Sequence, residues 1–171
     1  RFVKEAFDTN WVVPMGPNVN AFEQSLADFS NKNADGTMLD RKVVRLSAGT
    51  AAVQLALIAC GVQAGDEVIV QSFTFCASSH PITYLGAKPV FVDSERETWN
   101  MDPDLLEKAI VDRKEKTGKY PKAIIPVALY GMPYQIDKIM AIADKYGIPV
   151  IEDAAETWFG IWAAGVFARR E

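Results

Sequence analysis

Short apolar runs alternate with helical patterns along most of the chain. The runs are rich in Val, Ile and Ala, which is typical of strands buried on both faces of a sheet. Between them, apolar positions recur at spacings of three and four residues, as in amphipathic helices. These patterns predict strands over residues 43–46, 67–71, 89–92, 123–128 and 149–151. They predict helices over residues 18–33, 49–60, 78–85, 103–111 and 135–146, and a turn over residues 33–36.

The alternation of strands and helices predicts an α/β fold with a mainly parallel sheet flanked by helices. Pro126 lies inside the fourth predicted strand, where it cannot donate a ladder hydrogen bond, and so predicts a bulge or a strand end. In parallel α/β sheets, ligands bind outside the carboxyl ends of the strands. The candidates for chemistry are therefore the stretches that follow predicted strands: residues 47–50, 72–75 and 152–156.

Composition narrows the class of protein. The chain has 171 residues, 49% of them hydrophobic, and a net charge of −4, so it lacks the basic surface that nucleic acid or an anionic membrane attracts. No apolar run approaches the length of a membrane span. Cys60 and Cys76 match no zinc spacing and predict buried, reduced thiols in a cytoplasmic protein. The single histidine, His80, excludes a histidine-rich metal site, and we expect no metal.

Residues 47–52 join a predicted strand to the N-terminus of a predicted helix. Free backbone N–H groups and the helix dipole favour an anion there. Gly49 lets the backbone approach a ligand closely, and Thr50 adds a hydroxyl donor. The pattern is consistent with a phosphate-binding turn, and a plain capped turn is the alternative.

Asp153 closes the last apolar run. A carboxylate in this place could anchor an ion pair, hold magnesium or pair with a cationic ring. Glu156 follows three residues later and would share a helix face with it if a helix began here, which would suit general acid–base chemistry. Phe75 follows the second strand, where most aromatic residues belong to the core and a stacking role is the alternative.

Motifs of several common enzyme classes are absent from the sequence. There is no GxGxxG, no Walker loop, no GxSxG and no HExxH. These absences weigh against a nicotinamide enzyme, a P-loop NTPase, an α/β-hydrolase and a zincin.

An ordered set of segments between residues 11 and 156 resembles the DegT/DnrJ/EryC1/StrS family of sugar aminotransferases, which depend on pyridoxal 5'-phosphate (PLP). Each motif alone is weak, but their order and spacing together are specific. The set consists of Gly16-Pro17, Phe22-Glu23, residues 47–52, residues 65–69, residues 72–75, residues 86–93, Leu129-Tyr130-Gly131 and residues 151–156.

The resemblance implies the large domain of a PLP-dependent transferase of fold type I, which is usually a homodimer with active sites at the subunit interface. It implies transamination of a nucleotide-linked keto-sugar for amino-sugar and polysaccharide biosynthesis, with glutamate as the usual amino donor. From the net charge given above, we expect no nucleic acid or membrane partner.

The resemblance also assigns roles to residues. Gly49, Thr50 and Ala51 match the family's cofactor-phosphate segment, and Phe75 matches the aromatic residue that stacks on the pyridine ring. Asp153 matches the aspartate that pairs with the pyridinium nitrogen. Glu156, in the same motif, matches a position beside the cofactor near its phenolic oxygen.

The sequence departs from the family pattern after Glu156. The family carries its Schiff-base lysine after the aspartate motif, whereas this chain has no lysine after Lys145, so we assign no catalytic residue and expect the chain alone to be inactive. We interpret residues 1–36 as a lead-in segment with a helix, and residues 37–156 as a partial large domain truncated before the small C-terminal domain. We interpret residues 157–171 as an atypical tail from a frameshift or truncation, with natural divergence as the alternative.

Two alternatives to a sugar aminotransferase stay open at this point. One is a non-catalytic module, a pseudoenzyme or regulatory protein that binds PLP or a sugar nucleotide. The other is a dehydratase branch of the same family.

Overall fold

The computed structural model describes residues 1–31, 36–37, 42–157 and 166–169. The chain divides into two compact units, Arg1–Leu46 and Ser47–Glu171. None of the helices in these described ranges is both long enough and apolar enough to cross a membrane.

The first unit carries two helices, α1 (Phe2–Asp8) and α2 (Pro17–Ser30). Pro17 stands at the first turn of α2, where its missing N–H has no helical partner to lose. The range of α2 confirms the position of the helix predicted over residues 18–33. Neither helix contains a buried residue, so this unit has no helical core of its own.

The strand predicted over residues 43–46 is not formed. The backbone N–H of Arg45 instead donates to Glu23 Oε1 at 3.1 Å, and its guanidinium donates to the same oxygen at 3.2 Å and to the Pro14 carbonyl at 3.0 Å. A backbone N–H that binds a carboxylate is not available to a strand ladder, so this prediction is wrong. The turn predicted over residues 33–36 falls almost wholly outside the described residues.

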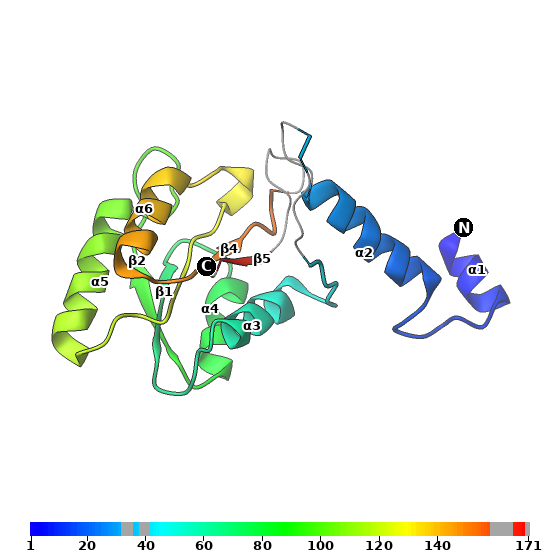
Figure 1. The fold of residues 1–171 in the computed structure, drawn as a ribbon, viewed down its shortest axis with the longest axis horizontal. Helices are drawn as coiled ribbons and strands as arrows, with labels where there is room; N and C mark the ends of the chain where they lie inside the picture. The colour runs from blue at the N-terminus through cyan, green and yellow to red at the C-terminus, as the bar shows by residue number, and fades with distance from the viewer. Residues whose placement is uncertain (32–35, 38–41, 158–165, 170–171) are drawn as a thin grey trace. The chain divides into compact units, whose positions relative to one another are not determined.

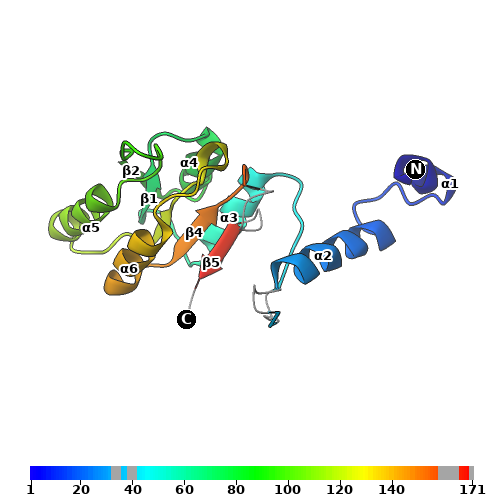
Figure 2. The same cartoon turned by 90° about the horizontal axis from the view of Figure 1, so that it is seen from above.

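The second unit holds a sheet with the strand order β2-β1-β3-β4-β5 (Figures 1 and 2). The first four strands along the chain pair in parallel, and β5 pairs with β4 in the antiparallel direction. The strands are β1 (Glu67–Gln71), β2 (Lys88–Val92), β3 (Ala123–Ile125), β4 (Val150–Asp153) and β5 (Val166–Arg169). The four strands predicted between residues 67 and 151 are therefore confirmed in position.

Strand β3 stops immediately before Pro126, as the sequence predicts. The Pro126 carbonyl still accepts a hydrogen bond from the Asp153 N–H at 3.0 Å, and a single bridge pairs Val127 with Asp153. Proline thus ends the regular strand, while the chain continues beside β4.

Four helices cover the two faces of the sheet. Figures 1 and 2 show α3 (Gly49–Ala59) and α4 (Cys76–Tyr84) on one side, and α5 (Pro103–Thr117) and α6 (Ile136–Tyr146) on the other. The core on the α3–α4 side includes Val53, Leu57, Val68, Val70, Ile82, Ile125 and Ile151. The core on the α5–α6 side includes Ile69, Leu106, Ile110, Ile124, Ile139, Ala143 and Val150. The predicted α/β architecture is confirmed.

Two details differ from the sequence-based expectation. Helix α5 continues beyond residue 111 to Thr117, because Lys and Glu residues favour helix and the next glycine, Gly118, adopts the left-handed conformation that ends it.

Cys60 is buried as predicted, but Cys76 is exposed at the start of α4, so the expectation of two buried thiols is wrong for Cys76.

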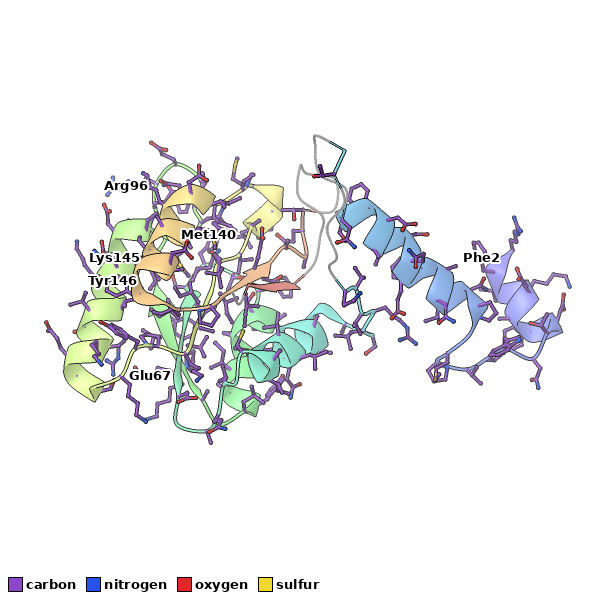
Figure 3. All side chains as sticks on the ribbon, in the orientation of Figure 1. Phe2, Glu67, Arg96, Met140, Lys145 and Tyr146 are labelled. Atoms are coloured by element: carbon purple, nitrogen blue, oxygen red, sulfur yellow. The ribbon has the colours of Figure 1, made fainter. Side chains whose placement is uncertain are left out.

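Ion pairs fasten helix α5 to its neighbours. Arg113 donates from Nε and Nη2 to the two carboxylate oxygens of Glu67 at 2.9 Å each, which joins α5 to the start of β1. Glu107 on the same helix accepts from Lys145 Nζ at 2.7 Å and from the Tyr146 hydroxyl at 2.9 Å. Figure 3 shows Lys145 and Tyr146 on α6. These contacts tie the α5–α6 layer together at its surface.

The strand order creates a switch point in the sheet. From β1 the chain passes to β2 on one side, and the later strands β3 and β4 lie on the other side of β1. Loops that leave β1 and β3 at their carboxyl ends therefore diverge, and in open α/β sheets ligands bind in the crevice that results.

Candidate functional site

Asp153 ends β4 at the carboxyl edge of the sheet, with only 7% of its surface exposed. Because side chains alternate along a strand, it shares the α3–α4 side of the sheet with Ile151. Its Oδ2 accepts a hydrogen bond from Ser78 Oγ at 2.7 Å, and its Oδ1 accepts from the Ala155 N–H at 3.3 Å. No cation among the described residues pairs with it. A buried carboxylate without a cationic partner is costly, which suits it to a cationic ligand.

Phe75 immediately precedes α4 and presents its ring to solvent, with 72% of its surface exposed. Its carbonyl accepts the backbone N–H of Ser78 at 3.1 Å. The same helix turn therefore carries the exposed ring and the hydroxyl that binds Asp153. The expectation that Phe75 belongs to the core, as most aromatic residues near strand ends do, is therefore wrong.

The segment from Gly49 to Ala51 forms the first turn of α3. The backbone N–H of Ala51 donates to the Ala48 carbonyl at 3.1 Å, whereas no described group accepts from the N–H of Gly49 or Thr50. Ala48 offers no side-chain cap to this turn. Two free N–H groups at a helix N-terminus are suited to an anion.

Glu156 lies after β4 in a turn, so the expectation that it shares a helix face with Asp153 is wrong. Its carboxylate instead accepts the backbone N–H of Tyr130. Tyr130 has a φ of 53°, and Gly131 a φ of 80°, beside the Glu156 carbonyl. A side chain at Gly131 would place its Cβ 3.2 Å from that carbonyl oxygen, which fits glycine at this close approach.

Hydrogen bonds thus bring some predicted site residues together and leave others apart. Phe75 and Asp153 are linked through Ser78. Helix α3 packs on α4 and contacts β4, yet no hydrogen bond among the described residues joins residues 49–51 to Asp153. Glu156 is held by the turn after β3.

Sequence reasoning missed a fully buried amide, Gln71, at the end of β1. Its Oε1 accepts the N–H of Val127 at 3.0 Å and the N–H of Met101 at 3.3 Å. Its Nε2 donates to the Phe73 carbonyl at 2.9 Å. Gln71 therefore ties together the loops that diverge at the switch point. The sequence did contain a signal for it, because a polar amide at the end of a continuous apolar run is unusual.

Asn100 extends this buried network and is also fully buried. Its Oδ1 accepts the N–H of Leu129 at 3.1 Å, and its Nδ2 donates to the Met132 carbonyl at 2.8 Å. These bonds hold both ends of the short helix η1 (Leu129–Gly131), which presents its backbone to Glu156.

Glu152 lies on the opposite side of β4 from Asp153, facing the α5–α6 layer. Burial raises the pKa of this carboxyl, and a hydrogen bond with Tyr134 partly opposes the shift. Burial also raises the pKa of Tyr134 above its usual range, with the Glu152 charge adding to the effect. Two neighbouring carboxylates thus face different surroundings.

The raised pKa of Glu152 predicts a pH dependence of stability. The folded chain binds this proton more tightly than the unfolded chain does. The stability contributed by Glu152 is therefore fully present below its unfolded pKa of about 4.3, and is lost as the pH rises through its folded pKa. In Glu152→Gln this loss disappears, so the variant should gain stability relative to wild type as the pH rises from about 4, by up to about 1.4 kcal/mol per pH unit.

Urea unfolding at several pH values measures this difference. Tyr134→Phe removes the hydrogen bond that opposes the rise in the Glu152 pKa, so this pKa should rise further. The stability of Tyr134→Phe should therefore fall over a wider pH range than that of wild type. A difference between Glu152→Gln and wild type that stays flat from about pH 4 to pH 8 would contradict the prediction.

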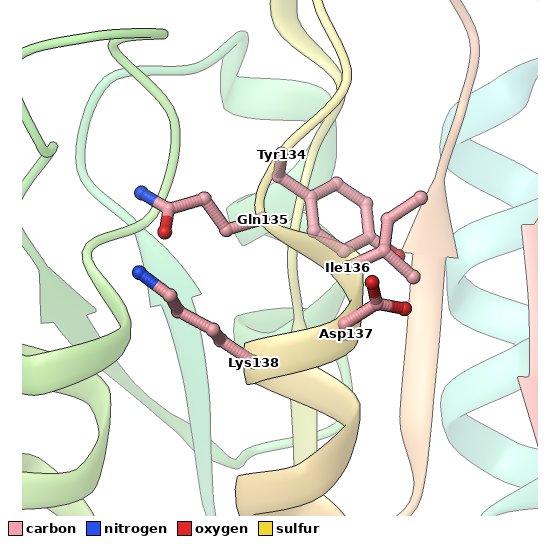
Figure 4. A pocket seen from close by; sticks show the side chains of 5 residues that line it. All are labelled: Tyr134, Gln135, Ile136, Asp137 and Lys138. Atoms are coloured by element: carbon pink, nitrogen blue, oxygen red, sulfur yellow. The ribbon is translucent and has the colours of Figure 1, made fainter.

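A hollow of about 490 Å³ lies at the start of α6 (Figure 4). Gln135 and Lys138 extend to one side of the helix start, and Tyr134 and Ile136 to the other. All its lining residues come from one segment, residues 134–138, and none is a predicted site residue. The hollow is therefore not the candidate site.

A profile described as the DegT/DnrJ/EryC1/StrS aminotransferase family matches residues 1–165. The Bacillus subtilis (strain 168) protein EpsN is 44% identical over an alignment 171 positions long, which covers 98% of this chain and 42% of that protein. The UDP-2-acetamido-2-deoxy-3-oxo-D-glucuronate aminotransferase of Pseudomonas aeruginosa is 46% identical over 144 residues, which are 84% of this chain and 36% of that protein. The chain thus spans about two fifths of the length of these relatives.

Solved structures of similar proteins share the fold. A DegT DnrJ EryC1 StrS aminotransferase from Brucella abortus aligns with a TM-score of 0.79 and 35% identity, over 90% of this chain and 39% of its own. NtdA from Bacillus subtilis, with bound cofactor PMP, aligns with a TM-score of 0.74 and 33% identity, over 94% of this chain and 36% of its own.

Proposed function

Because the chain belongs to the DegT/DnrJ/EryC1/StrS aminotransferase family, we propose that it forms the cofactor-binding part of an enzyme that aminates a nucleotide-linked keto-sugar with PLP. The observation that carries this proposal is the buried Asp153 carboxylate, which no described cation neutralises. The sugar-nucleotide substrate is supported by the name of the Pseudomonas aeruginosa relative, and the cofactor by the PMP bound to NtdA.

The residues at the carboxyl edge of the sheet and at the start of α3 fit the chemical groups of PLP. When bound, PLP withdraws electrons from the reacting carbon, provided that its ring nitrogen is protonated. Asp153 would keep the proton on that nitrogen, since an adjacent carboxylate favours the charged ring. The exposed ring of Phe75 would lie against the pyridine face, and the first turn of α3 would bind the phosphate through the N–H groups of Gly49 and Thr50 and the Thr50 hydroxyl. Glu156 would lie near the phenolic oxygen.

Covalent attachment of PLP needs a lysine, and the family resemblance places that lysine beyond the aspartate motif. This chain has no lysine after Lys145. We therefore propose that Asp153, Phe75 and the first turn of α3 hold the cofactor by non-covalent contacts, and that transamination also needs the lysine of the family pattern.

We also propose glutamate as the amino donor and a homodimer as the working assembly, both by family resemblance. We propose a cytoplasmic location as well.

Titration with PLP and with pyridoxal, which lacks the phosphate, tests the proposal. Wild type should bind PLP more tightly than pyridoxal. Thr50→Ala should lower the affinity for PLP about tenfold, the scale of one hydrogen bond to a charged group, and leave the affinity for pyridoxal unchanged. Absorbance or tryptophan fluorescence reports both affinities.

Thr50→Ser keeps the hydroxyl and is the matched control, with an affinity for PLP close to that of wild type. Absence of PLP binding to wild type would contradict the proposed function. An equal loss of PLP and pyridoxal affinity in Thr50→Ala would contradict the phosphate role alone.

A further inference from the structure

A chain of two hydroxyl groups ends on the Asp153 carboxylate. Thr74 Oγ1 lies 3.1 Å from Ser78 Oγ, which lies 2.7 Å from Asp153 Oδ2. Ser78 has 1% of its surface exposed and Asp153 has 7%, so water competes little for the bond between them. Both hydroxyls come from the segment that leaves β1 and begins α4.

The direction of these hydrogen bonds follows from counting protons. An ionised carboxylate only accepts, and a hydroxyl carries one proton, so Ser78 must donate to Asp153. The Ser78 oxygen is then free to accept, and Thr74 is its donor. Both hydroxyl dipoles therefore point toward the carboxylate, and the bond to the charged group is the stronger of the two.

The backbones on both sides of this contact are fixed. The Ser78 N–H donates to the Phe75 carbonyl at 3.1 Å, which sets the serine in the first turn of α4. The Asp153 N–H donates to the Pro126 carbonyl at 3.0 Å, and its own carbonyl accepts the Ala128 N–H at 3.1 Å. What remains free on Asp153 is the rotation of its side chain, and Ser78 restricts that rotation by holding Oδ2.

The other carboxylate oxygen is less engaged. Oδ1 accepts only one recorded hydrogen bond among the described residues, from the Ala155 N–H at 3.3 Å. With Oδ2 held by Ser78, Oδ1 keeps acceptor capacity for a ligand N–H.

We propose that Ser78, supported by Thr74, is a positioning residue that orients the Asp153 carboxylate toward the ring nitrogen of the cofactor. This inference rests on the proposed function, because it assumes that Asp153 meets a protonated ring. Ser78 would not touch the cofactor and would act only through Asp153.

The test compares PLP with its 1-deaza analogue, in which carbon replaces the ring nitrogen, on the 171-residue chain. Ser78→Ala should weaken PLP binding about tenfold, the scale of one hydrogen bond to a charged group, and change binding of the analogue by less than about twofold. Ser78→Thr should restore PLP binding. Thr74→Val, which removes the weaker bond, should lower PLP affinity by about threefold.

A double-mutant cycle completes the design. In an Asp153→Asn background, Ser78→Ala should produce no further loss of PLP affinity, because its effect passes through the carboxylate. Ser78→Cys keeps nearly the same size with a weak donor, so it should repeat the Ser78→Ala result even if the alanine variant folds poorly. Circular dichroism checks that each variant is folded.

The outcomes separate the inference from the function on which it rests. Equal weakening of PLP and the deaza analogue by Ser78→Ala and Ser78→Cys would show a general structural role and overturn the inference. Loss of PLP affinity in Asp153→Asn with none in the Ser78 variants would overturn the inference and leave the proposed function standing. Absence of PLP binding to wild type would overturn both.

Discussion

Asp153→Asn is expected to bind PLP about 100-fold more weakly than wild type. The substitution keeps the size of the side chain and an oxygen that accepts from Ser78, so the fold at the end of β4 is preserved. It removes the negative charge that would face the protonated ring. Loss of one partner from a desolvated charge pair costs about 2–5 kcal/mol, and each 1.4 kcal/mol is a factor of ten in affinity.

Glu152→Gln is the matched control for this prediction. It removes a carboxylate from the adjacent position of the same strand, but on the face toward Tyr134 and the α5–α6 layer. Its affinity for PLP should stay close to that of wild type in equilibrium titrations at neutral pH. Equal losses in the two variants would mean that overall charge, and not the Asp153 site, controls binding.

Gln71→Leu is expected to lower the free energy of unfolding by about 3–5 kcal/mol. Leucine fits the volume but cannot bond the N–H of Val127, the N–H of Met101 or the Phe73 carbonyl. Each buried polar group left without a partner costs about 1–3 kcal/mol. Urea unfolding followed by circular dichroism measures the loss.

Gln63→Leu is the control, because the Gln63 side chain is exposed and a surface substitution of this kind changes stability by about 0.5 kcal/mol or less. Comparable stabilities of Gln71→Leu and Gln63→Leu would show that the buried network is dispensable. Because Gln71 and Asn100 together hold the loops after β1 and β3, Gln71→Leu should also weaken PLP binding.

The sequence predicted the parallel core well, because its strands are continuous apolar runs with clear ends. β1 begins after a Gly-Asp turn and matches its predicted range, residues 67–71. The run over residues 43–46 had a similar apolar pattern but forms no strand. An apolar run shows which residues can be buried, and does not show whether a neighbouring strand is available to pair with them. Pro126 was informative because it has no N–H to donate to a neighbouring strand, and β3 ends directly before it.

The candidate site was predictable only where a residue type was unusual for its place. Asp153 stood out as a carboxylate at the end of an apolar strand. Ser78 and Thr74 did not, because hydroxyl residues are common near helix starts and nothing local indicates a partner on another strand. The approach of Glu156 to Tyr130 depends on a left-handed backbone that a single sequence does not reveal.

The bond between Ser78 and Asp153 also bears on how the chain folds. It joins positions 75 residues apart, so it closes a long loop and can form only after β1, β3 and β4 have aligned. Helices such as α3 and α5 contain only local backbone contacts and can form before this bond does. A ligand that binds only the aligned sheet stabilises it by mass action. PLP would therefore stabilise the chain only at a late stage of folding. A nascent chain would gain affinity for PLP only once β4 has been synthesised.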